Sequence, residues 1–465
     1  MFRVITRAGK DASAVRAALE RFYPGWGIEV STLRGVRRVD DMLAALWEIV
    51  DRDPYKPSIL LLGREDAGKV DEIEKKAPLN VFVHLVPRSK VRNARLELIA
   101  AEIARARAKI RLRASWDQGR RAYVFSNMGE PLERLAYEPS FEAFIGVGAF
   151  PRLVEALSGE AIGRNPLVIR AHGGLHLVYN GPRVRAELEI SDTGLAPRAR
   201  IVSSNVVDVE LSSLIESNRE YIGVLERASQ QFLRELGSFD TVIVPWSGGK
   251  DSTAALLLAI SIYGAENVVA LYVDTGTEFP ATRQYVHSVA DKLGIRLVEA
   301  YAGIDKALAS GKPLPSHDNR WCTGLKIEAI ESKVRELARG RTLLVIGDRD
   351  AESPRRSNRP PIRPGPAPNV LAVAPLKLWG AAHIQLYLLS KGVPLNPMYY
   401  AGFYRIGCYM CPALRSWELL SLSSDTRTYL RLLRSPIFRA FISNRLRRRL
   451  HKTLGDECPL GGICA

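Results

Sequence analysis

The sequence predicts an α/β protein in which a parallel-sheet domain follows a small α/β domain and a small β-rich domain. The chain has 465 residues, more than one ordinary hydrophobic core holds, so roughly two to four domains are expected. Between residue 240 and about residue 415, short apolar runs alternate with helix-length segments, which is typical of parallel strands joined by helices. Residues 116–205 instead contain short runs separated by turn residues, which indicates antiparallel strands.

The composition is that of a globular protein with a strong basic bias. Hydrophobic residues make up 46% and charged residues 25% of the chain, which excludes a disordered protein. No apolar run reaches the roughly 18 residues of a membrane span, and the N-terminus lacks the apolar core of a secretory signal, so we expect a cytoplasmic protein with no membrane partner. The net charge of +16 favours RNA or nucleotides as partners, although an arginine-rich surface is also typical of a thermophile.

The first predicted domain covers residues 1–115, and its role is not indicated. Apolar runs at 58–63 and 80–86 suit buried parallel strands, and residues 89–112 predict a long helix with an Arg/Lys-rich face. A G-x-x-x-x-G-K match at 63–70 follows the first of these runs. We interpret this match as a plain turn, because a valine replaces the hydroxyl that would hold Mg²⁺ and two acidic residues would face the phosphates.

The second predicted domain, residues 116–205, is β-rich. Asn180 and Gly181, between two alternating apolar segments, indicate a β-hairpin. The size and the basic edge of this domain would suit an RNA-binding module of the PUA kind. The basic residues of that edge are Arg183, Arg185, Arg198 and Arg200.

The third predicted domain covers residues 206–415, and residues 416–465 are expected to form a basic helical tail. A helix at 211–236 leads into the domain, and the Pro/Arg-rich segment 353–369 has no periodicity and is predicted to be a loop. The expected strands are 240–246, 267–274, 296–300 and 342–348. The expected helices are 251–263, 280–293, 324–338 and 380–391.

The segment WSGGKDST, residues 246–253, lies where the first of these strands gives way to a helix. Its glycines allow backbone N–H groups to point inward as an anion site, and the helix N-terminus adds its positive dipole end. Lys250 supplies a positive charge, the hydroxyls can donate to phosphate oxygens, and Asp251 would hold a divalent cation or cap the helix. The predicted nucleotide-binding residues of this loop are Ser247, Gly248, Gly249, Lys250, Asp251, Ser252 and Thr253.

The spacing S-G-G-x-D-S resembles the pyrophosphate loop of the PP-loop ATP pyrophosphatases, which split ATP between its α and β phosphates. Stretches at 272–282, 346–359 and 375–412 follow in an order that resembles the phosphoadenosine phosphosulfate (PAPS) reductase family of that superfamily. This resemblance covers roughly residues 240–415. It implies an adenine nucleotide alpha-hydrolase-like fold that binds an adenine nucleotide, either ATP or PAPS, with Mg²⁺.

The ends of the predicted strands add further residues to this site. Asp274 would approach the adenosine or its metal, and Gly347 and Arg349 follow another strand. Arg355 and Arg356 would neutralise phosphate or sulfate with forked donors, or else lie on a solvated or RNA-facing loop. The residues predicted to be catalytic here are Lys250, Asp251 and Asp274.

The five cysteines all lie beyond residue 320, which argues for metal or redox chemistry and against a disulfide framework. Cys322 precedes a predicted helix, and Cys408 and Cys411 form a C-x-x-C motif. In iron–sulfur members of the resembled family a Cys pair and a C-x-x-C hold a 4Fe–4S cluster, but Trp321 stands here in place of the first Cys of the pair. The three thiolates would hold a 4Fe–4S cluster with one open iron, or Zn²⁺ with a fourth ligand from a C-terminal cysteine or a histidine, or remain unmetallated.

The C-terminal DECPLGGIC segment resembles the late Glu-Cys-Gly-(Ile/Leu)-His segment of sulfonucleotide reductases, whose cysteine attacks sulfur. Glu457 and Cys458 fit this pattern, whereas Pro459 replaces the glycine and no histidine follows in place. Cys458 is therefore a candidate nucleophile, with a metal ligand or a pair with Cys464 as the alternatives.

The intact loop favours ATP and release of pyrophosphate, because reductases of the resembled family tend to have degraded loops. The expected activity is ATP-dependent adenylation coupled to sulfur transfer, with tRNA or other RNA as the candidate acceptor and a sulfur-donor protein as partner. One alternative is a PAPS or APS reductase that releases sulfite and uses a thiol reductant protein. The other is a non-catalytic RNA-binding protein with a relic nucleotide site.

Overall fold

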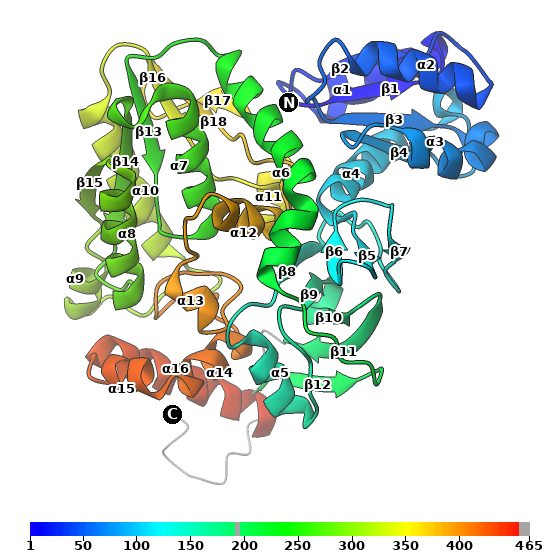
Figure 1. Cartoon of the computed structure of the whole chain (residues 1–465). Coiled ribbons are helices and arrows are strands. Elements are labelled where there is room, and N and C mark those ends of the chain that lie inside the picture. The colour runs from blue at the N-terminus through cyan, green and yellow to red at the C-terminus, as the bar shows by residue number, and fades with distance from the viewer. Residues whose placement is uncertain (191–195, 455–465) are drawn as a thin grey trace.

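The computed structural model describes residues 1–190 and 196–454, with side chains described as far as Leu446 (Figure 1). Cys458 and Cys464 lie outside the described residues. Four β-sheets and their covering helices follow one another along the chain in the α/β arrangement that the sequence predicts. Among the described residues, none of the helices is both long and apolar enough to cross a lipid bilayer.

The N-terminal region contains a four-stranded parallel sheet in the order β2-β1-β3-β4. The apolar runs expected to be strands form β3 and β4, and α1 and α4 pack together in this region. The long helix begins later than predicted, because residues 91–93 form a 3-10 turn and Arg95 is extended. The strands are β1 Arg3–Thr6, β2 Glu29–Thr32, β3 Ser58–Leu62 and β4 Val81–Leu85; the helices are α1 Gly9–Phe22, α2 Val39–Val50, α3 Val70–Lys76 and α4 Leu96–Leu112.

The next region is antiparallel, as predicted. A three-stranded sheet, β6-β5-β7, precedes a five-stranded sheet, β12-β11-β10-β9-β8, and helix α5 (Phe150–Ser158) packs against β12. The predicted hairpin is confirmed, because Asn180 ends β10 and pairs with Arg183 of β11 across Gly181, whose φ is +61°. The strands are β5 Ser115–Asp117, β6 Ala122–Val124, β7 Glu130–Pro131, β8 Glu142–Ile145, β9 Leu167–Arg170, β10 Leu175–Asn180, β11 Arg183–Glu189 and β12 Arg198–Ile201.

The basic edge predicted on this sheet is only partly exposed. Arg185 is buried, and its guanidinium donates to the carbonyls of Ala161 and Ser203 and pairs with Glu160. The prediction that Arg185 lies on an RNA-facing edge is therefore wrong, because its guanidinium hydrogen-bonds to neighbouring loops instead of facing solvent. Arg198 and Arg200 are exposed, and Arg200 pairs with Glu187 at 2.6 Å.

A six-stranded sheet in the order β15-β14-β13-β16-β18-β17 forms the third region (Figure 1). Five neighbouring strands are parallel, and β17 pairs antiparallel to β18 at the edge. The chain extends from β13 to β14 and β15 on one side and then crosses to β16 on the other, so the strand order reverses between β13 and β16. In open parallel sheets, ligands bind at this switch point, outside the carboxyl ends of the strands.

The predicted strands and helices of this region are confirmed to within a few residues. The Pro/Arg-rich segment 353–369 was predicted to be a loop, but it contains the short helix α11 and the edge strand β17, which tolerates Pro364 because an edge strand can lack a donor. The strands are β13 Thr241–Pro245, β14 Val268–Asp274, β15 Arg296–Tyr301, β16 Thr342–Val345, β17 Ile362–Pro364 and β18 Val370–Val373. The helices are α6 Leu211–Arg234, α7 Lys250–Tyr263, α8 Pro280–Leu293, α9 Ile304–Ala309, α10 Trp321–Leu337, α11 Pro354–Ser357, α12 Ala381–Ser390 and α13 Pro397–Tyr400.

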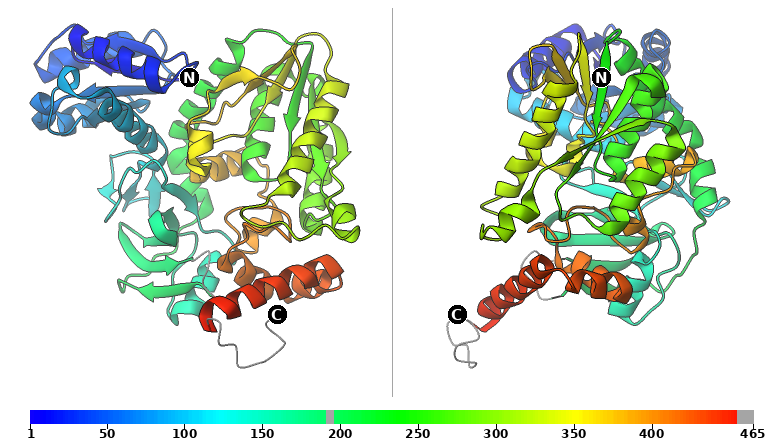
Figure 2. Two further views of the ribbon diagram at one scale, coloured as in Figure 1. Left: turned by 180° about the vertical axis from the view of Figure 1, so that it is seen from behind. Right: turned by 90° about the vertical axis from the view of Figure 1, so that its left-hand side faces the viewer.

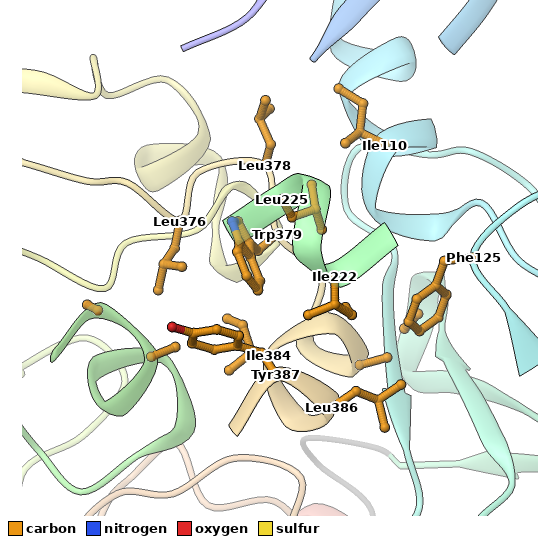
Figure 3. Close-up of a cluster of buried hydrophobic side chains, with 14 of the residues drawn as sticks. Ile110, Phe125, Ile222, Leu225, Leu376, Leu378, Trp379, Ile384, Leu386 and Tyr387 are labelled. Atoms are coloured by element: carbon orange, nitrogen blue, oxygen red, sulfur yellow. The ribbon is translucent and has the colours of Figure 1, made fainter. Parts of the chain in front are cut away.

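One hydrophobic core joins the three regions. Figure 3 shows part of this core, in which Ile110 of α4, Ile222 and Leu225 of α6, Trp379 and Leu386 of α12 belong to one cluster. The C-terminal helices α14 (Ser416–Ser424), α15 (Thr426–Leu433) and α16 (Pro436–Leu454) lie at the lower end of the molecule in both views of Figure 2. Because these surfaces are buried together, the positions of the β-rich region and the parallel sheet are fixed relative to one another.

Two histidines are buried in this framework without charge. Burial lowers the pKa of His176 to about 3 and the pKa of His383 to about 3. In the unfolded chain each of these histidines takes up a proton near pH 6.5, whereas in the folded chain it does so only near pH 3. The free energy of unfolding therefore falls as the pH falls from about 6.5 towards 3. We expect each histidine to cost about 2 kcal/mol of unfolding free energy at pH 5 relative to pH 7.

Urea unfolding at pH 5 and pH 7 measures this effect. His383→Gln and His176→Asn should each flatten the pH dependence, because these side chains do not titrate in that range. If both variants keep the wild-type slope between pH 5 and pH 7, other groups carry the acid sensitivity.

Candidate nucleotide-binding site

The loop between β13 and α7 is held open by glycine geometry and by its own hydroxyls. Gly248 has φ +71°, and a Cβ there would lie 2.9 Å from Val286, so no other residue fits without movement. The Ser247 N–H donates to Ser252 Oγ at 3.1 Å. The Lys250 N–H donates to the Tyr399 hydroxyl at 3.1 Å, which ties the first turn of α7 to α13.

A cavity of about 720 Å³ opens at this loop. It lies at the carboxyl ends of β13 and β16, which is the switch point of the sheet, and its other walls come from the five-stranded sheet and the chain after α13. Cationic side chains outnumber carboxylates in its lining, so the cavity suits an anionic ligand of metabolite size. The cationic residues are Arg170, Lys250, Arg320, Arg349, Arg356, Arg405 and Arg415, and the carboxylates are Glu142, Asp251, Asp348 and Glu352.

Buried ion pairs connect the loop to the β-rich region. Arg349 is 2% exposed, and its Nε donates to Asp251 Oδ1 at 2.6 Å while its Nη1 donates to Glu142 Oε2 at 2.5 Å. Lys250 Nζ lies 3.1 Å from the second oxygen of Asp251. Burial opposes ionisation of Asp251, but Arg349 and then Lys250 hold its pKa below the usual value. The carboxylate that the sequence places beside phosphates is therefore balanced by two cations.

Most of the predicted loop residues border the cavity. Ser247, Gly249, Lys250, Asp251 and Ser252 line it, whereas Gly248 and Thr253 are not among its lining residues. The hydroxyl of Thr253 is used internally, since it accepts from Trp246 Nε1 at 2.9 Å and donates to the Gly249 carbonyl.

Of the predicted nucleotide-binding residues beyond the loop, some also line the cavity and some do not. Gly347, Arg349 and Arg356 line the cavity, and Arg356 pairs with Glu352 and lies 3.5 Å from Asp348. Arg355 is exposed and is not among the lining residues.

Asp274 lies at the end of β14, on the other side of β13 from the switch point. Its Oδ1 accepts from the Gly276 N–H at 2.8 Å, and its Oδ2 lies 3.5 Å from Arg283. Asp274 is not among the residues that line the cavity. In this structure it stabilises the turn that follows β14.

Cys322 lies in the first turn of α10, and Cys408 lies beside the turn after β14. The Cys411 N–H donates to the Cys408 carbonyl at 3.1 Å, and Cys408 Sγ lies 3.8 Å from Thr275 Oγ1. Burial, and then the neighbouring Cys411 thiol, raise the pKa of Cys322 above its ordinary value. Within residues 1–190 and 196–446, no group of three or more His, Cys, Asp or Glu side chains is placed to hold a metal ion. Cys322, Cys408 and Cys411, the three ligands expected of a cluster or a zinc site, are therefore not placed to hold a metal ion in the described structure.

Cys408 should be unreactive in the folded protein. Burial, followed by the nearby carboxylate of Glu278, raises its pKa to about 12. At neutral pH it should hold roughly 1,000-fold less thiolate than an ordinary thiol, and thiolate is the reactive form. Iodoacetamide labelling followed by peptide mass spectrometry should show slow modification of Cys408 in buffer and fast modification in urea. Equal rates in the two conditions would contradict the raised pKa of this half-buried thiol.

The sequence analysis missed the contribution of the β-rich region. Glu142 of β8 and Arg170 of β9 lie opposite each other in the ladder, and both line the cavity. Glu142 also accepts from the Ala381 N–H at the start of α12, at 2.9 Å. In the sequence, each of these two strands simply contains one charged residue beside apolar ones. No motif marks Glu142 or Arg170 as part of a binding site.

Comparison with known proteins identifies the class of the third region. Residues 241–414 match the model of the phosphoadenosine phosphosulfate reductase domain. The chain therefore contains a domain of the PAPS reductase family, as the loop and the motifs after it predicted.

Among curated proteins, an uncharacterized protein of Methanocaldococcus jannaschii is 32% identical over 186 residues, which is 40% of this chain and 38% of that protein. Adenosine 5'-phosphosulfate reductase of Rhodococcus erythropolis is 29% identical over 147 residues, 31% of this chain and 58% of that enzyme. The adenosine 5'-phosphosulfate reductase of Rhizobium tropici is 29% identical over 151 residues, 30% of this chain and 79% of that enzyme. The chain thus spans less than two thirds of the length of the first two of these relatives.

Solved structures show more distant similarity. The phosphoadenylyl-sulfate reductase of Candida auris, in a phosphate complex, aligns with 42% of this chain and 97% of its own at 21% identity, with a TM-score of 0.33. The FMN adenylyltransferase of Candida glabrata, in complex with FAD and inorganic pyrophosphate, aligns with 41% of this chain and 64% of its own at 18% identity, with a TM-score of 0.32.

Proposed function

We propose that the cavity at the β13–α7 loop binds ATP and that the protein cleaves it between the α and β phosphates to adenylate an acceptor. The observation that carries this proposal is the intact Ser247–Ser252 loop opening onto a cavity with more cations than carboxylates. Loop N–H groups and Lys250 would face the β and γ phosphates. A matched PAPS reductase domain supports a nucleotide substrate for the same site.

In this reaction an acceptor oxygen attacks the α-phosphorus, and the bond from that phosphorus to the α–β bridging oxygen breaks. Pyrophosphate leaves with the electron pair, and the loop N–H groups and Lys250 stabilise its charge. The cavity carboxylates are already paired, Asp251 with Lys250 and Arg349 and Glu142 with Arg349. An Mg²⁺ ion would therefore be held mainly by the nucleotide phosphates, where it would neutralise charge.

Transfer of sulfur to the adenylated acceptor is the finer form of this proposal. A sulfur nucleophile would displace AMP, and a sulfur-donor protein would supply it. The net charge of +16 supports an RNA acceptor such as tRNA. This finer proposal also includes an iron–sulfur cluster or a zinc ion bound by Cys322, Cys408 and Cys411. Such binding would require these side chains to move from their described positions.

A sulfonucleotide reductase is the second candidate. Two of the relatives are adenosine 5'-phosphosulfate reductases, and the matched domain carries the reductase name. In this version the nucleotide in the cavity is APS or PAPS, a thiol reductant protein supplies electrons, and sulfite is released. Cys458, outside the described residues, would be the nucleophile.

The two candidates differ in the product that they release. Protein purified without oxygen, with its iron and sulfide measured, is incubated with ATP labelled at the γ-phosphate, with and without total tRNA, and separately with sulfur-labelled APS and PAPS plus dithiothreitol. We expect labelled pyrophosphate from ATP, increased by the correct acceptor. Labelled sulfite without pyrophosphate would select the reductase. Neither product with any acceptor would favour a non-catalytic RNA-binding protein.

A further inference from the structure

The C-terminal helices carry much of the positive charge of the chain. Residues 426–454, which include α15 and α16, contain eight arginines and one lysine and no Asp or Glu. These cations account for more than half of the net charge of +16. The matched reductase domain ends at residue 414, so this concentration of charge lies outside it.

Three arginines of this segment form an exposed stripe along α15. Arg427, Arg431 and Arg434, here called the α15 arginines, are spaced by four and then three residues, which places them on one face of the helix. All three are exposed, and none of the carboxylates in the described part of the chain pairs with them. Asp425, the nearest carboxylate in sequence, caps α15 by accepting the Thr428 N–H at 3.2 Å. The three guanidinium groups therefore face solvent without an internal counter-ion.

The opposite faces of α15 and α16 are packed against the protein. The Tyr429 ring lies edge-on to Phe438 of α16 with 5.8 Å between ring centroids, and Phe438 lies edge-on to Tyr409 at 5.9 Å. Leu432 is buried as well, and Leu430 is the one large apolar side chain of α15 that is exposed, at 57%. A helix that binds a lipid surface needs a broad apolar face for the acyl chains. A basic surface whose apolar side is already buried favours a hydrated polyanion instead.

These helices are anchored to the wall of the nucleotide cavity. The chain between α13 and α14 lines that cavity and contributes the exposed cation Arg405 to it. Tyr409 follows four residues later, packs against α16 through Phe438, and donates its N–H to the Thr277 carbonyl at 3.0 Å. Figure 1 shows α14, α15 and α16 below α13, whose Tyr399 also lines the cavity. The basic surface thus lies at the end of the molecule towards which the cavity wall leads.

We propose that the α15 arginines bind the phosphate backbone of the RNA acceptor and hold it so that one of its bases reaches the ATP α-phosphate past Arg405. The inference rests on the proposed function and names the surface that holds its acceptor. Each guanidinium can donate two parallel hydrogen bonds to a phosphate group. Contacts of this kind give affinity and orientation without reading the sequence. The cavity, and not α15, therefore selects the base that reacts.

Binding of total tRNA to the full chain at several salt concentrations tests this surface. Labelled tRNA is titrated with wild-type protein and with the triple variant Arg427→Gln/Arg431→Gln/Arg434→Gln, and the association constant is measured between about 50 and 200 mM salt. Loss of three phosphate contacts should make the slope of log K against log salt shallower by about 2 and weaken binding by about tenfold or more. ATP binding should not change, because none of the α15 arginines lines the nucleotide cavity.

A matched control removes the same charge elsewhere. Arg37, Arg38 and Arg52 are exposed and flank α2, which Figure 1 shows at the opposite end of the molecule from α15. Arg37→Gln/Arg38→Gln/Arg52→Gln should keep the wild-type affinity and slope. Equal weakening in the two triple variants would overturn the proposal, because tRNA would then respond only to net charge. Thermal unfolding shows whether each variant is folded, and Arg431→Gln alone, with about a third of the change in slope, tests the surface if the triple variant is not.

The outcomes separate this inference from the proposed function. If tRNA binding depends on the α15 arginines but wild-type protein releases no pyrophosphate from ATP, the proposed function fails and the RNA surface remains. If tRNA increases pyrophosphate release but binds the α15 variant as tightly as wild type, the RNA surface is wrong and the proposed function remains. Wild-type protein is also mixed with vesicles of phosphatidylcholine and phosphatidylglycerol. Vesicle binding that is tighter than tRNA binding and is lost in the α15 variant would overturn the proposal in favour of a membrane surface.

Discussion

Replacing Lys250 by alanine is expected to lower nucleotide-dependent turnover by about 10² to 10³-fold, the usual cost of losing one fixed electrostatic contact to the leaving charge. Lys250 is the cation that the β13–α7 loop itself contributes to the cavity, and its side chain is 6% exposed. Its ammonium lies 3.1 Å from Asp251 and 5.7 Å from the centroid of the Tyr399 ring. The side chain is thus held at the first turn of α7, where the β and γ phosphates of ATP would lie.

Initial rates of pyrophosphate release measure this loss, and Lys69→Ala is the matched control. Lys69 also follows a glycine in a strand–loop–helix segment, but its ammonium pairs with Asp66 at 2.8 Å, and Arg7 pairs with the same carboxylate at 2.7 Å. We expect Lys69→Ala to keep wild-type activity. Equal losses in the two variants would mean that the loop at Ser247–Ser252 has no special role.

Replacing Glu142 by alanine is expected to lower the free energy of unfolding by about 3–5 kcal/mol, the range for breaking a buried ion pair from one side. Glu142 is 6% exposed, and burial opposes its ionisation, but Arg349 keeps its pKa below the usual value. Its removal leaves Arg349 with Asp251 as its one carboxylate partner and removes the acceptor of the Ala381 N–H. The loop should lose its position together with Arg349, so nucleotide affinity should fall as well.

Urea unfolding and ATP binding are measured on the same Glu142→Ala preparation. Glu216→Ala is the control, because it removes an ion pair at the surface, where Glu216 and Arg219 are 69% and 71% exposed. That exposed pair should contribute less than about 1 kcal/mol. A loss in Glu142→Ala no larger than the loss in Glu216→Ala would show that the Glu142–Arg349 contact does not hold the regions together.

The loop could be predicted from the sequence because its chemistry is local. The strand, the glycines, the lysine and the helix follow one another between Thr241 and Tyr263. In the structure the glycines form the loop at the carboxyl end of β13, a central strand of the sheet, and the lysine begins the helix. The alternation of strands and helices is equally local, so the parallel sheet followed from periodicity. The same reasoning missed β17, because the pairing that makes residues 362–364 a strand comes from β18.

The remaining walls of the cavity could not be predicted, because they depend on contacts between distant parts of the chain. Glu142 and Arg349 are 207 residues apart in sequence, and Arg107 and Asp350 are 243 apart. Asp274 shows the converse, since it lies at a strand end, as predicted, but on the side of β13 away from the switch point. A strand end identifies the correct edge of the sheet, whereas the crossover between β13 and β16 decides where on that edge the cavity lies.

Binding of ATP in competition with inorganic pyrophosphate is the most direct test of the central claim, which is that the Ser247–Ser252 loop holds nucleotide phosphates. Titration calorimetry should show a single class of ATP sites, and pyrophosphate should displace ATP because both occupy the loop. Absence of saturable ATP binding, or ATP binding that pyrophosphate does not weaken, would contradict the claim.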